Sequence, residues 1–339
     1  MEFIDIRAWF MARPILQFIQ SNETVLPPLE KVNDSILASK STVFKSGYAS
    51  LIGKPNVGKS TLLNHLVSSK LAAISRRPQT TRNKITGICH LPGGQIILMD
   101  TPGIHQSTSK LNQAMVHASM STYGDVDVIL FMVDAKQKFQ PEDEFVLDSL
   151  KDVKIPVFLV INKIDLIPKP EVLGLMAELK SRAPFTDIIP ISALKEDGLD
   201  LLKEILLKHL PEGPQYFPED MITDCPEEFL VAEIIREKII RLTHLEVPYA
   251  VAVMIESMRE GKNGVMVIDA AIYVEKASQK KIIIGEKGSL LKKVGSQARI
   301  EIEKRLGSKV YLNSFVKIKE RWRESARYLK EFGYTHGHH

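Results

Sequence analysis

The fold of this chain is decided by one stretch of its sequence, Gly53-Lys54-Pro55-Asn56-Val57-Gly58-Lys59-Ser60. The stretch fits the pattern G-x-x-x-x-G-K-S and lies between an apolar segment (48–52) and a segment with helical patterning (60–69). In a loop of this kind, backbone N–H groups and the N-terminus of the following helix face phosphate oxygens. We therefore expect the Lys59 ammonium to reach the β- and γ-phosphates and the Ser60 hydroxyl to bind Mg²⁺.

Apolar segments and helical segments alternate from residue 47 to residue 210. The expected strands are 48–52, 84–91, 95–100, 126–134, 156–162 and 187–191. The expected helices between them include 60–69, 142–150, 171–181 and 199–209. A short connection, Pro92–Gly94, separates the second strand from the third and predicts an antiparallel hairpin. The alternation otherwise predicts an α/β domain with a mostly parallel sheet covered by helices.

A second motif, Asp100-Thr101-Pro102-Gly103, follows the third expected strand. The strand would place the Asp100 carboxylate beside Mg²⁺, acting through a bound water, and Gly103 would let its N–H approach the γ-phosphate. Ile104 stands where Ras-like GTPases carry a glutamine that orients water. Because an isoleucine side chain cannot hydrogen-bond to water, we expect slow intrinsic hydrolysis or assistance from another group.

Two further motifs indicate which base is bound: Asn162-Lys163-Ile164-Asp165 and Ser192-Ala193. The Asp165 carboxylate can accept hydrogen bonds from N1–H and the 2-amino group of guanine, which adenine does not offer. Ser192-Ala193 would complete the pocket with a backbone N–H directed at guanine O6. The predicted nucleotide is GTP, which becomes GDP on hydrolysis.

A threonine between the phosphate loop and the second strand is expected to sense the γ-phosphate through Mg²⁺. The sequence favours Thr81 and leaves Thr80 open. The predicted metal ligands are Ser60, Thr81 and Asp100, and the predicted catalytic residues are Lys59, Thr81 and Gly103. The predicted nucleotide-binding residues are Gly53, Lys54, Pro55, Asn56, Val57, Gly58, Lys59, Ser60, Thr61, Asp100, Thr101, Pro102, Gly103, Ile104, Asn162, Lys163, Asp165, Ser192 and Ala193.

Prolines and a glycine after residue 210 mark a domain boundary. The expected elements beyond it are a helix (229–242), two strands (250–257 and 265–274), two helices around 285–288, a strand (309–317) and a helix (320–332). This order is typical of a type II KH domain, which is an α+β fold. The predicted organisation is a flexible N-terminal extension (1–46), a GTPase domain (47–210), a linker (211–227) and a KH domain (228–334).

Positive charge is concentrated in Lys276–Lys330, which holds sixteen Lys/Arg and five Asp/Glu, a net +11 in a chain of net charge +4. Within it, Gly285-Glu286-Lys287-Gly288 fits the G-x-x-G loop with which KH domains clamp about four nucleotides of RNA. Trp322, between two arginines, fits either a base-stacking role or an anchor for the last helix. The predicted RNA-binding residues are Lys280, Lys281, Gly285, Glu286, Lys287, Gly288, Lys292 and Lys293.

The ordered motifs GKPNVGKS, RPQTTR, DTPGIH, NKID and SAL resemble the Era family of bacterial ribosome-assembly GTPases. The segments AEIIREK (232–238) and VYLNSFVKIK (310–319) resemble the same family, so that the resemblance covers residues 45–334. It implies binding to the 3′ end of small-subunit (16S) ribosomal RNA during assembly of the 30S subunit. In relatives that also have a hydrophobic residue in place of the glutamine, an asparagine matching Asn56 helps to bind K⁺, which implies K⁺-stimulated hydrolysis.

The composition fits a globular protein of about two domains, with 339 residues, 44% hydrophobic and 25% charged. The longest apolar runs, 128–133 and 157–161, fall far short of the ~20 residues that cross a bilayer. The two cysteines, Cys89 and Cys225, form neither a disulfide framework nor a zinc pattern, which favours a reducing compartment. We expect a cytoplasmic monomer and leave open a peripheral contact with the inner face of the cell membrane.

Three questions stay open at the level of sequence. The first residues fit a short amphipathic helix interrupted at Pro14 and match neither a signal peptide nor a transit peptide. An alternative is that the true start lies downstream, at Met11. One alternative function is a membrane-associated signalling GTPase whose basic tail binds anionic lipid. Another is a tRNA-modifying GTPase, which would need an additional catalytic domain that no residue cluster in this sequence supplies.

Overall fold

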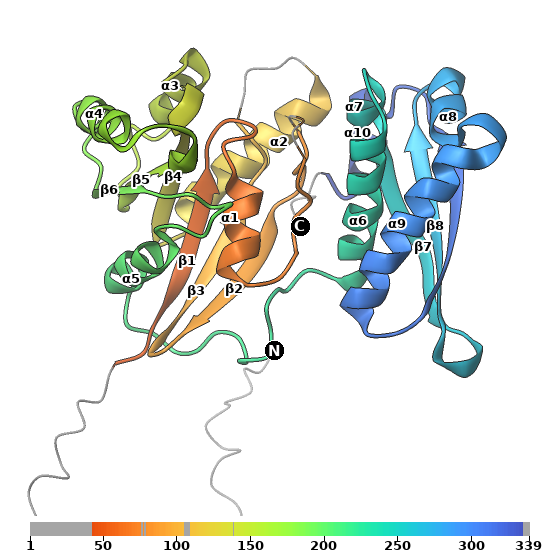
Figure 1. The fold of residues 1–339 in the computed structure, drawn as a ribbon, viewed down its shortest axis with the longest axis horizontal. Helices are drawn as coiled ribbons and strands as arrows, with labels where there is room; N and C mark the ends of the chain where they lie inside the picture. The colour runs from red at the N-terminus through yellow and green to blue at the C-terminus, as the bar shows by residue number, and fades with distance from the viewer. Residues whose placement is uncertain (1–42, 76, 78, 105–108, 138, 335–339) are drawn as a thin grey trace, which may run out of the picture. The chain divides into compact units, whose positions relative to one another are not determined.

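The computed structural model describes residues 43–75, 77, 79–104, 109–137 and 139–334. Within these ranges the chain forms a six-stranded sheet and a three-stranded sheet, each packed against helices (Figure 1). The expected amphipathic helix near the N-terminus, the alternative start at Met11 and nearly all of the expected extension lie outside the described residues. No helix within the described ranges is both long and apolar enough to span a membrane.

The larger sheet has the strand order β2-β3-β1-β4-β5-β6. Its strands are β1 (Lys45–Ile52), β2 (Ile85–Leu91), β3 (Gly94–Asp100), β4 (Val128–Asp134), β5 (Val157–Asn162) and β6 (Asp187–Pro190). Strand β2 is antiparallel to β3, and the other neighbours are parallel. The structure therefore confirms the predicted hairpin and the predicted mostly parallel sheet.

Helices pack on both faces of this sheet (Figure 1). They are α1 (Lys59–Leu66), α2 (Lys110–Met120), α3 (Pro141–Asp148), α4 (Lys169–Lys180) and α5 (Leu199–His209). Every residue of β3 and β4 is buried, and successive residues of β4 alternate between two apolar clusters, one on each face. This double burial explains why these strands are continuous apolar runs.

One strand of the larger sheet starts earlier than expected, and one helix was not expected from the sequence. Strand β1 starts at Lys45, three residues before the expected strand, because its first residues pair with Gly94 and its neighbours in β3. Helix α2 occupies a region for which the sequence analysis named no element. It starts where the Ser109 side chain accepts a hydrogen bond from Asn112 N (3.3 Å).

The carboxyl ends of β1, β3, β4 and β5 lie at the same edge of the sheet, because these strands are parallel. The phosphate loop, the Asp100 motif and the Asn162 motif all follow these ends. Parallel sheets place their ligands at such an edge. The topology thus gathers three motifs that are spread over more than one hundred residues of the sequence.

The residues predicted as a linker pack along the edge strand β2. Ile88 N donates a hydrogen bond to Ile222 O (2.9 Å), and Thr223 Oγ1 donates one to Thr86 O (2.6 Å). These bonds satisfy part of the backbone of an edge strand.

The smaller sheet has the order β7-β8-β9, with β7 antiparallel and β9 parallel to β8. Its strands are β7 (Ala252–Glu260), β8 (Met266–Val274) and β9 (Val310–Ile318). The helices are α6 (Glu227–Leu242), α7 (Val247–Ala250), α8 (Ala277–Ile284), α9 (Ser289–Leu306) and α10 (Ala326–Glu331). Apart from the extra turn of α7, this is the predicted helix–strand–strand–helix–helix–strand order.

The last predicted helix, 320–332, is shorter in the structure. Residues Trp322–Glu324 form a single 3-10 turn, and α10 starts only after Ser325, whose side chain accepts a hydrogen bond from Tyr328 N. Trp322 is fully buried, and its Nε1 donates to Ala250 O (2.9 Å). Of the two roles left open for Trp322, the structure selects the anchor, because a buried ring cannot stack on a base.

Candidate functional site

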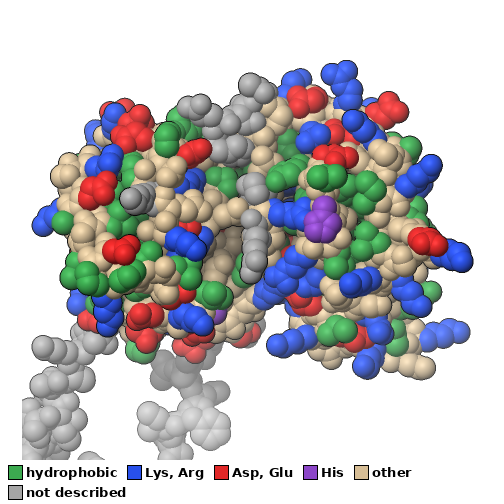
Figure 2. All heavy atoms as spheres, turned by 45° about the horizontal axis from the view of Figure 1, so that its top comes forward, with side chains coloured by type: hydrophobic (Ala, Val, Ile, Leu, Met, Phe, Trp, Pro, Cys, Tyr) green, Lys and Arg blue, Asp and Glu red, His purple; other side chains and the backbone are tan. Residues whose placement is uncertain are grey.

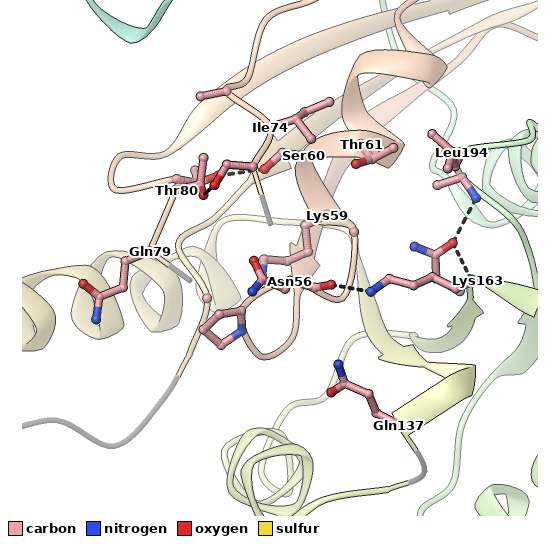
Figure 3. A pocket seen from close by; sticks show the side chains of 18 of the residues that line it. Asn56, Lys59, Ser60, Thr61, Ile74, Gln79, Thr80, Gln137, Lys163 and Leu194 are labelled. Atoms are coloured by element: carbon pink, nitrogen blue, oxygen red, sulfur yellow. Dashed lines mark hydrogen bonds between the residues drawn. The ribbon is translucent and has the colours of Figure 1, made fainter. Parts of the chain in front are cut away.

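The phosphate loop connects β1 to α1, and its residues line one wall of a cavity (Figure 3). Gly58 has a left-handed φ of 108°, and a Cβ there would lie 2.1 Å from Asn162 Nδ2, so that only glycine fits. Lys59 Nζ donates hydrogen bonds to Gly53 O (2.9 Å) and Lys54 O (3.1 Å). Burial lowers the pKa of Lys59 to about 8, against the attraction of the Asp100 carboxylate. The ammonium is thus held against the loop that would receive phosphate.

Three oxygen-bearing side chains meet beside Lys59. Ser60 Oγ donates to Asp100 Oδ2 (2.6 Å) and lies 2.7 Å from Thr81 Oγ1, which itself donates to Asp100 Oδ2 (3.2 Å). Thr80 turns away and hydrogen-bonds to Ser75 Oγ (2.7 Å). The structure therefore brings Thr81, and not Thr80, to the other two predicted metal ligands.

The chemistry of this cluster fits a magnesium ion. Asp100 is buried, and its Oδ1 has no hydrogen-bond partner among the described residues. Burial raises the pKa of Asp100 to about 6, although the nearby Lys59 ammonium lowers it. A buried carboxylate with one orphaned oxygen, and with two hydroxyls bonded to its other oxygen, is a set of the hard oxygen donors that Mg²⁺ prefers.

Asn162, at the end of β5, connects the phosphate loop to the segment that contains Ala193 through hydrogen bonds of its side chain. Its Nδ2 donates to Val57 O (2.7 Å), and its Oδ1 accepts from Ala193 N (2.9 Å). Lys163 Nζ donates to Asn56 O (2.7 Å), as the dashed line in Figure 3 marks, and forms an ion pair with Asp134 (2.6 Å). These contacts hold the phosphate loop and the base-recognition residues in a fixed geometry.

Asp165 is exposed to the cavity, and one of its oxygens is already oriented. Ser192 Oγ donates to Asp165 Oδ1 (2.6 Å), and Ser192 itself is buried. The Asp165 carboxylate is thereby held in one orientation on the lining of the cavity that Lys59 also lines.

The cavity has a volume of about 480 Å³, within the usual range of about 300–1,000 Å³ for ligand sites. The predicted residues that line it are Pro55, Asn56, Gly58, Lys59, Ser60, Thr61, Thr81, Gly103, Asn162, Lys163, Asp165 and Ala193. The predicted residues that do not line it are Gly53, Lys54, Val57, Asp100, Thr101, Pro102, Ile104 and Ser192.

Several lining residues were missed by the sequence analysis. They are Ala73, Ile74, Ser75, Gln79, Gln137, Leu166 and Leu194. Leu166 and Leu194 are 51% and 68% exposed, and they directly follow Asp165 and Ala193. Their positions next to base-recognition motifs were the available signal, whereas nothing local in the sequence marks Gln137.

Lys54 has a partner that the sequence did not reveal. Its buried ammonium forms an ion pair with Asp143 Oδ2 of α3 (2.6 Å). Asp143 also accepts a hydrogen bond from Gln140 N (2.9 Å) at the start of that helix. The phosphate loop is therefore tied to α3 through a charged pair buried from solvent.

The predicted G-x-x-G loop joins α8 to α9 through the 3-10 turn Glu286–Gly288. A Cβ on Gly285 would lie 2.8 Å from Leu290 Cβ, whereas one on Gly288, whose φ is 80°, would face open space among the described atoms. The predicted lysines at 281, 287, 292 and 293 and Glu286 are exposed, and Lys280 is half-buried. Figure 2 shows many Lys and Arg side chains, interspersed with apolar ones, on one face of this part of the chain. The loop thus offers accessible backbone surrounded by positive charge.

The fold and these sites define a P-loop GTPase domain followed by a KH domain. A model of the family "50S ribosome-binding GTPase" matches residues 48–163, and a KH-domain model matches residues 246–323. GTPase Era of Geobacter metallireducens is 53% identical over 86% of this chain and 98% of its own length, and GTPase Era of Halothermothrix orenii is 51% identical over 86% and 99%. The chain belongs to the Era family of GTPases, as the motifs indicated.

Two solved structures are similar over the same range. A variant of Aquifex aeolicus Era bound to GDP·AlF4⁻ is 44% identical with a TM-score of 0.83, covering 86% of this chain and 100% of that one. Era in complex with MgGDPNP and nucleotides 1506–1542 of 16S ribosomal RNA is 45% identical with a TM-score of 0.84, covering 86% and 99%. The predicted fold class, GTPase activity, and use of GTP, GDP and Mg²⁺ are thereby confirmed.

Proposed function

We propose that this chain uses its GTP-bound and GDP-bound states to control binding of the 3′ region of 16S ribosomal RNA, and that it assists assembly of the 30S subunit. The observation that carries the proposal is the presence, in one chain, of the Ser60–Thr81–Asp100 cluster and an open, basic G-x-x-G loop. The Era structure with both MgGDPNP and 16S ribosomal RNA supports it, because that relative holds the two kinds of ligand together.

In the proposed hydrolysis, the phosphate loop and Lys59 hold the triphosphate in place. A water oxygen bonds to the γ-phosphorus while the bond from that phosphorus to the bridging oxygen breaks, which gives GDP and phosphate. Lys59 and the Gly103 N–H stabilise the charge that develops on the phosphate oxygens. Ser60, Thr81 and Asp100 would hold Mg²⁺, which neutralises further negative charge there when it is bound.

Ile104 takes no part in orienting the attacking water. Its side chain is fully buried in the core, and its N–H donates to Gly53 O (3.2 Å). We therefore propose slow intrinsic turnover that K⁺, bound with the help of Asn56, would stimulate. Replacing K⁺ by Na⁺ should lower the turnover, and equal rates in the two salts would contradict this part of the proposal.

Selection of guanine is proposed to reside in Asp165, which Ser192 orients. Asn162 would act indirectly, since its side chain is already bonded to Val57 O and the Ala193 N–H. The exposed Leu166 and Leu194, with the stem of Lys163, would supply apolar contact to the faces of the base.

RNA binding is proposed to use the Gly285–Gly288 backbone and the lysines predicted at 280, 281, 287, 292 and 293. Their positive charge would supply affinity for the phosphate backbone, and the loop would bring N–H groups close to it. We place this activity in the cytoplasm, where ribosomal subunits assemble. Family membership favours RNA over the alternative of anionic lipid for the basic domain.

The test is GTP turnover in K⁺ buffer with a short RNA that copies the 3′ end of 16S ribosomal RNA, with a scrambled RNA of equal length, and with anionic vesicles. We expect stimulation by the first RNA alone. Equal stimulation by the scrambled RNA would contradict specific recognition, and stimulation by vesicles alone would favour the lipid-binding alternative.

A further inference from the structure

Arg82 directly follows Thr81, yet its side chain leads away from the nucleotide cavity into the C-terminal part of the chain. It is only 2% exposed. Its Nη1 donates to Val251 O (2.7 Å), and its Nη2 donates to Pro248 O (3.0 Å) and Tyr249 O (3.1 Å). A guanidinium group that is buried at such a place is held firmly, because it would lose these bonds and not regain water if it moved.

The same guanidinium lies against a cluster of aromatic rings, which we call the C-terminal aromatic cluster (Trp322, Phe332 and Tyr334). Its central carbon is 5.8 Å from the centroid of the Trp322 ring and 5.8 Å from that of the Tyr334 ring. These two rings stack on each other with centroids 5.7 Å apart, and the Phe332 ring meets Trp322 edge-on. Cation–π contact with two desolvated rings adds to the three hydrogen bonds.

The stretch that carries Thr81 is held on its other side as well. Arg236 of α6 donates a hydrogen bond to Thr80 O, and its guanidinium is paired with Glu233 on the same helix. Thr81 therefore lies between two residues that are both fixed by C-terminal elements. Since consecutive Cα atoms are about 3.8 Å apart, fixing both neighbours leaves the Thr81 hydroxyl little freedom.

The segment that follows the Asp100 motif reaches the same aromatic cluster. Leu111 and Met115 of α2 are buried in one apolar core with Trp322, Leu329, Phe332 and Tyr334. The segment that carries Thr81 and helix α2, which follows the Asp100 motif, are thus both packed against residues near the C-terminus.

We propose that Arg82 is a positioning residue: by anchoring in the C-terminal aromatic cluster, it holds the Thr81 hydroxyl beside Ser60 and Asp100. The inference rests on the proposed roles of these three residues at the metal and γ-phosphate. A ligand whose binding needs the Thr81 hydroxyl in this place also stabilises the anchored arrangement of Arg82. Loss of the anchor therefore weakens the binding of such a ligand more than the binding of a ligand that does not need Thr81. GDP without Mg²⁺ does not need Thr81, whereas a GTP analogue with Mg²⁺ does.

The test compares affinities for GDPNP with Mg²⁺ and for GDP with EDTA in the full chain carrying Arg82→Met, Arg82→Lys or Tyr334→Leu. For Arg82→Met we expect the ratio of the affinity for GDPNP with Mg²⁺ to the affinity for GDP with EDTA to fall about tenfold, which is a typical size for coupling between sites. Arg82→Lys should recover part of the ratio, because a lysine keeps the charge but not the forked donor geometry. Tyr334→Leu, about 250 residues away in sequence, should lower the ratio in the same direction.

Arg77→Met is the matched control, since Arg77 comes from the same loop and also bonds to a C-terminal residue, His244, at 3.0 Å. Its ratio should stay at the wild-type value. The proposal is overturned if Arg82→Met weakens both nucleotides equally, or if Tyr334→Leu leaves the ratio unchanged while its melting curve shows a folded protein. A wild-type chain without preference for GDPNP with Mg²⁺ would instead count against the proposed roles of Ser60, Thr81 and Asp100.

Discussion

At the scale of single residues, we propose that the choice of base depends on Asp165. Its carboxylate is oriented by Ser192 Oγ and faces the cavity, while the neighbouring Asn162 is occupied in holding two loops together. A carboxylate that is built to receive two donors rejects a base that lacks them, because it would then stay unpaired.

The first prediction concerns this carboxylate. Asp165→Asn should weaken GTP binding by about 100-fold, since an amide cannot accept both guanine donors at full strength. The affinity for xanthosine triphosphate relative to that for GTP should rise, because the new NH₂ group can donate a hydrogen bond to the xanthine C2 carbonyl. Competition titration with the two nucleotides measures this, and Asp187→Asn, an exposed carboxylate on β6, serves as the control. Unchanged GTP affinity would contradict the proposed role.

The second prediction concerns Asp100, whose pKa burial raises from 3.8 to about 6. In the metal-free chain the folded state holds this proton more tightly than the unfolded state does, so the stabilisation is fully present below pH 3.8 and is lost as the pH rises through about 6. Mg²⁺ competes with this proton, and its affinity should fall about tenfold per pH unit below that value. A Mg²⁺ titration of nucleotide binding from about pH 5 to about pH 8 measures the slope. Asp100→Asn should weaken Mg²⁺ binding and leave only the pH dependence that comes from titration of the nucleotide phosphates.

At the scale of elements, the phosphate loop is positioned by its neighbours as much as by its own sequence. The Lys54–Asp143 pair joins the loop to α3, and the Asn162 side chain joins it to the end of β5. A loop that keeps its shape before the ligand arrives loses less entropy on binding.

The third prediction tests the tie between the loop and α3. Asp143→Ala should destabilise the chain by about 3 kcal/mol, because it leaves a buried Lys54 ammonium without its partner. Adding Lys54→Met should recover most of that loss, since the unpaired charge is then gone. Chemical denaturation of the two single variants and the double variant measures the coupling. If the double variant is as unstable as the sum of the two single variants, the pair has no special role in stability.

On the scale of the whole molecule, charge is divided between two parts of the chain. Lys276–Lys330 carries a net +11, and the remainder is acidic overall. Binding of the basic domain to a polyanion releases counterions, and the affinity therefore falls steeply as salt is added.

The fourth prediction uses this salt dependence. Changing lysines 287, 292 and 293 to glutamine should weaken RNA binding at low salt and reduce the slope of log K against log salt by about 2, at roughly 0.7 per phosphate contact in single strands. The matched control changes three exposed lysines of the GTPase domain, at positions 154, 169 and 180, to glutamine. An equal change of slope in the two triple variants would show that RNA binding is not localised at the G-x-x-G loop.

Much of the fold and of the nucleotide site could be predicted from the sequence. The strands of the larger sheet are apolar runs buried on both faces, and the phosphate loop needs glycines at fixed spacing, so both leave a local signal. The type II KH order was likewise readable from alternating segments. The ends of helices and strands were harder to predict. Strand β1 starts earlier than expected because it pairs with β3, and helix α10 starts later than expected because Ser325 caps it.

The class of domains, the nucleotide and the basic loop could all be inferred from the sequence alone, because each rests on residues that are close neighbours along the chain. Tertiary structure decided what depends on residues far apart. It selected Thr81 over Thr80 by bringing its hydroxyl to Ser60 and Asp100, it buried Trp322 as an anchor, and it paired Lys54 with Asp143. It also carried Arg82 into the C-terminal aromatic cluster, about 240 residues away, and no local pattern records a contact of that kind.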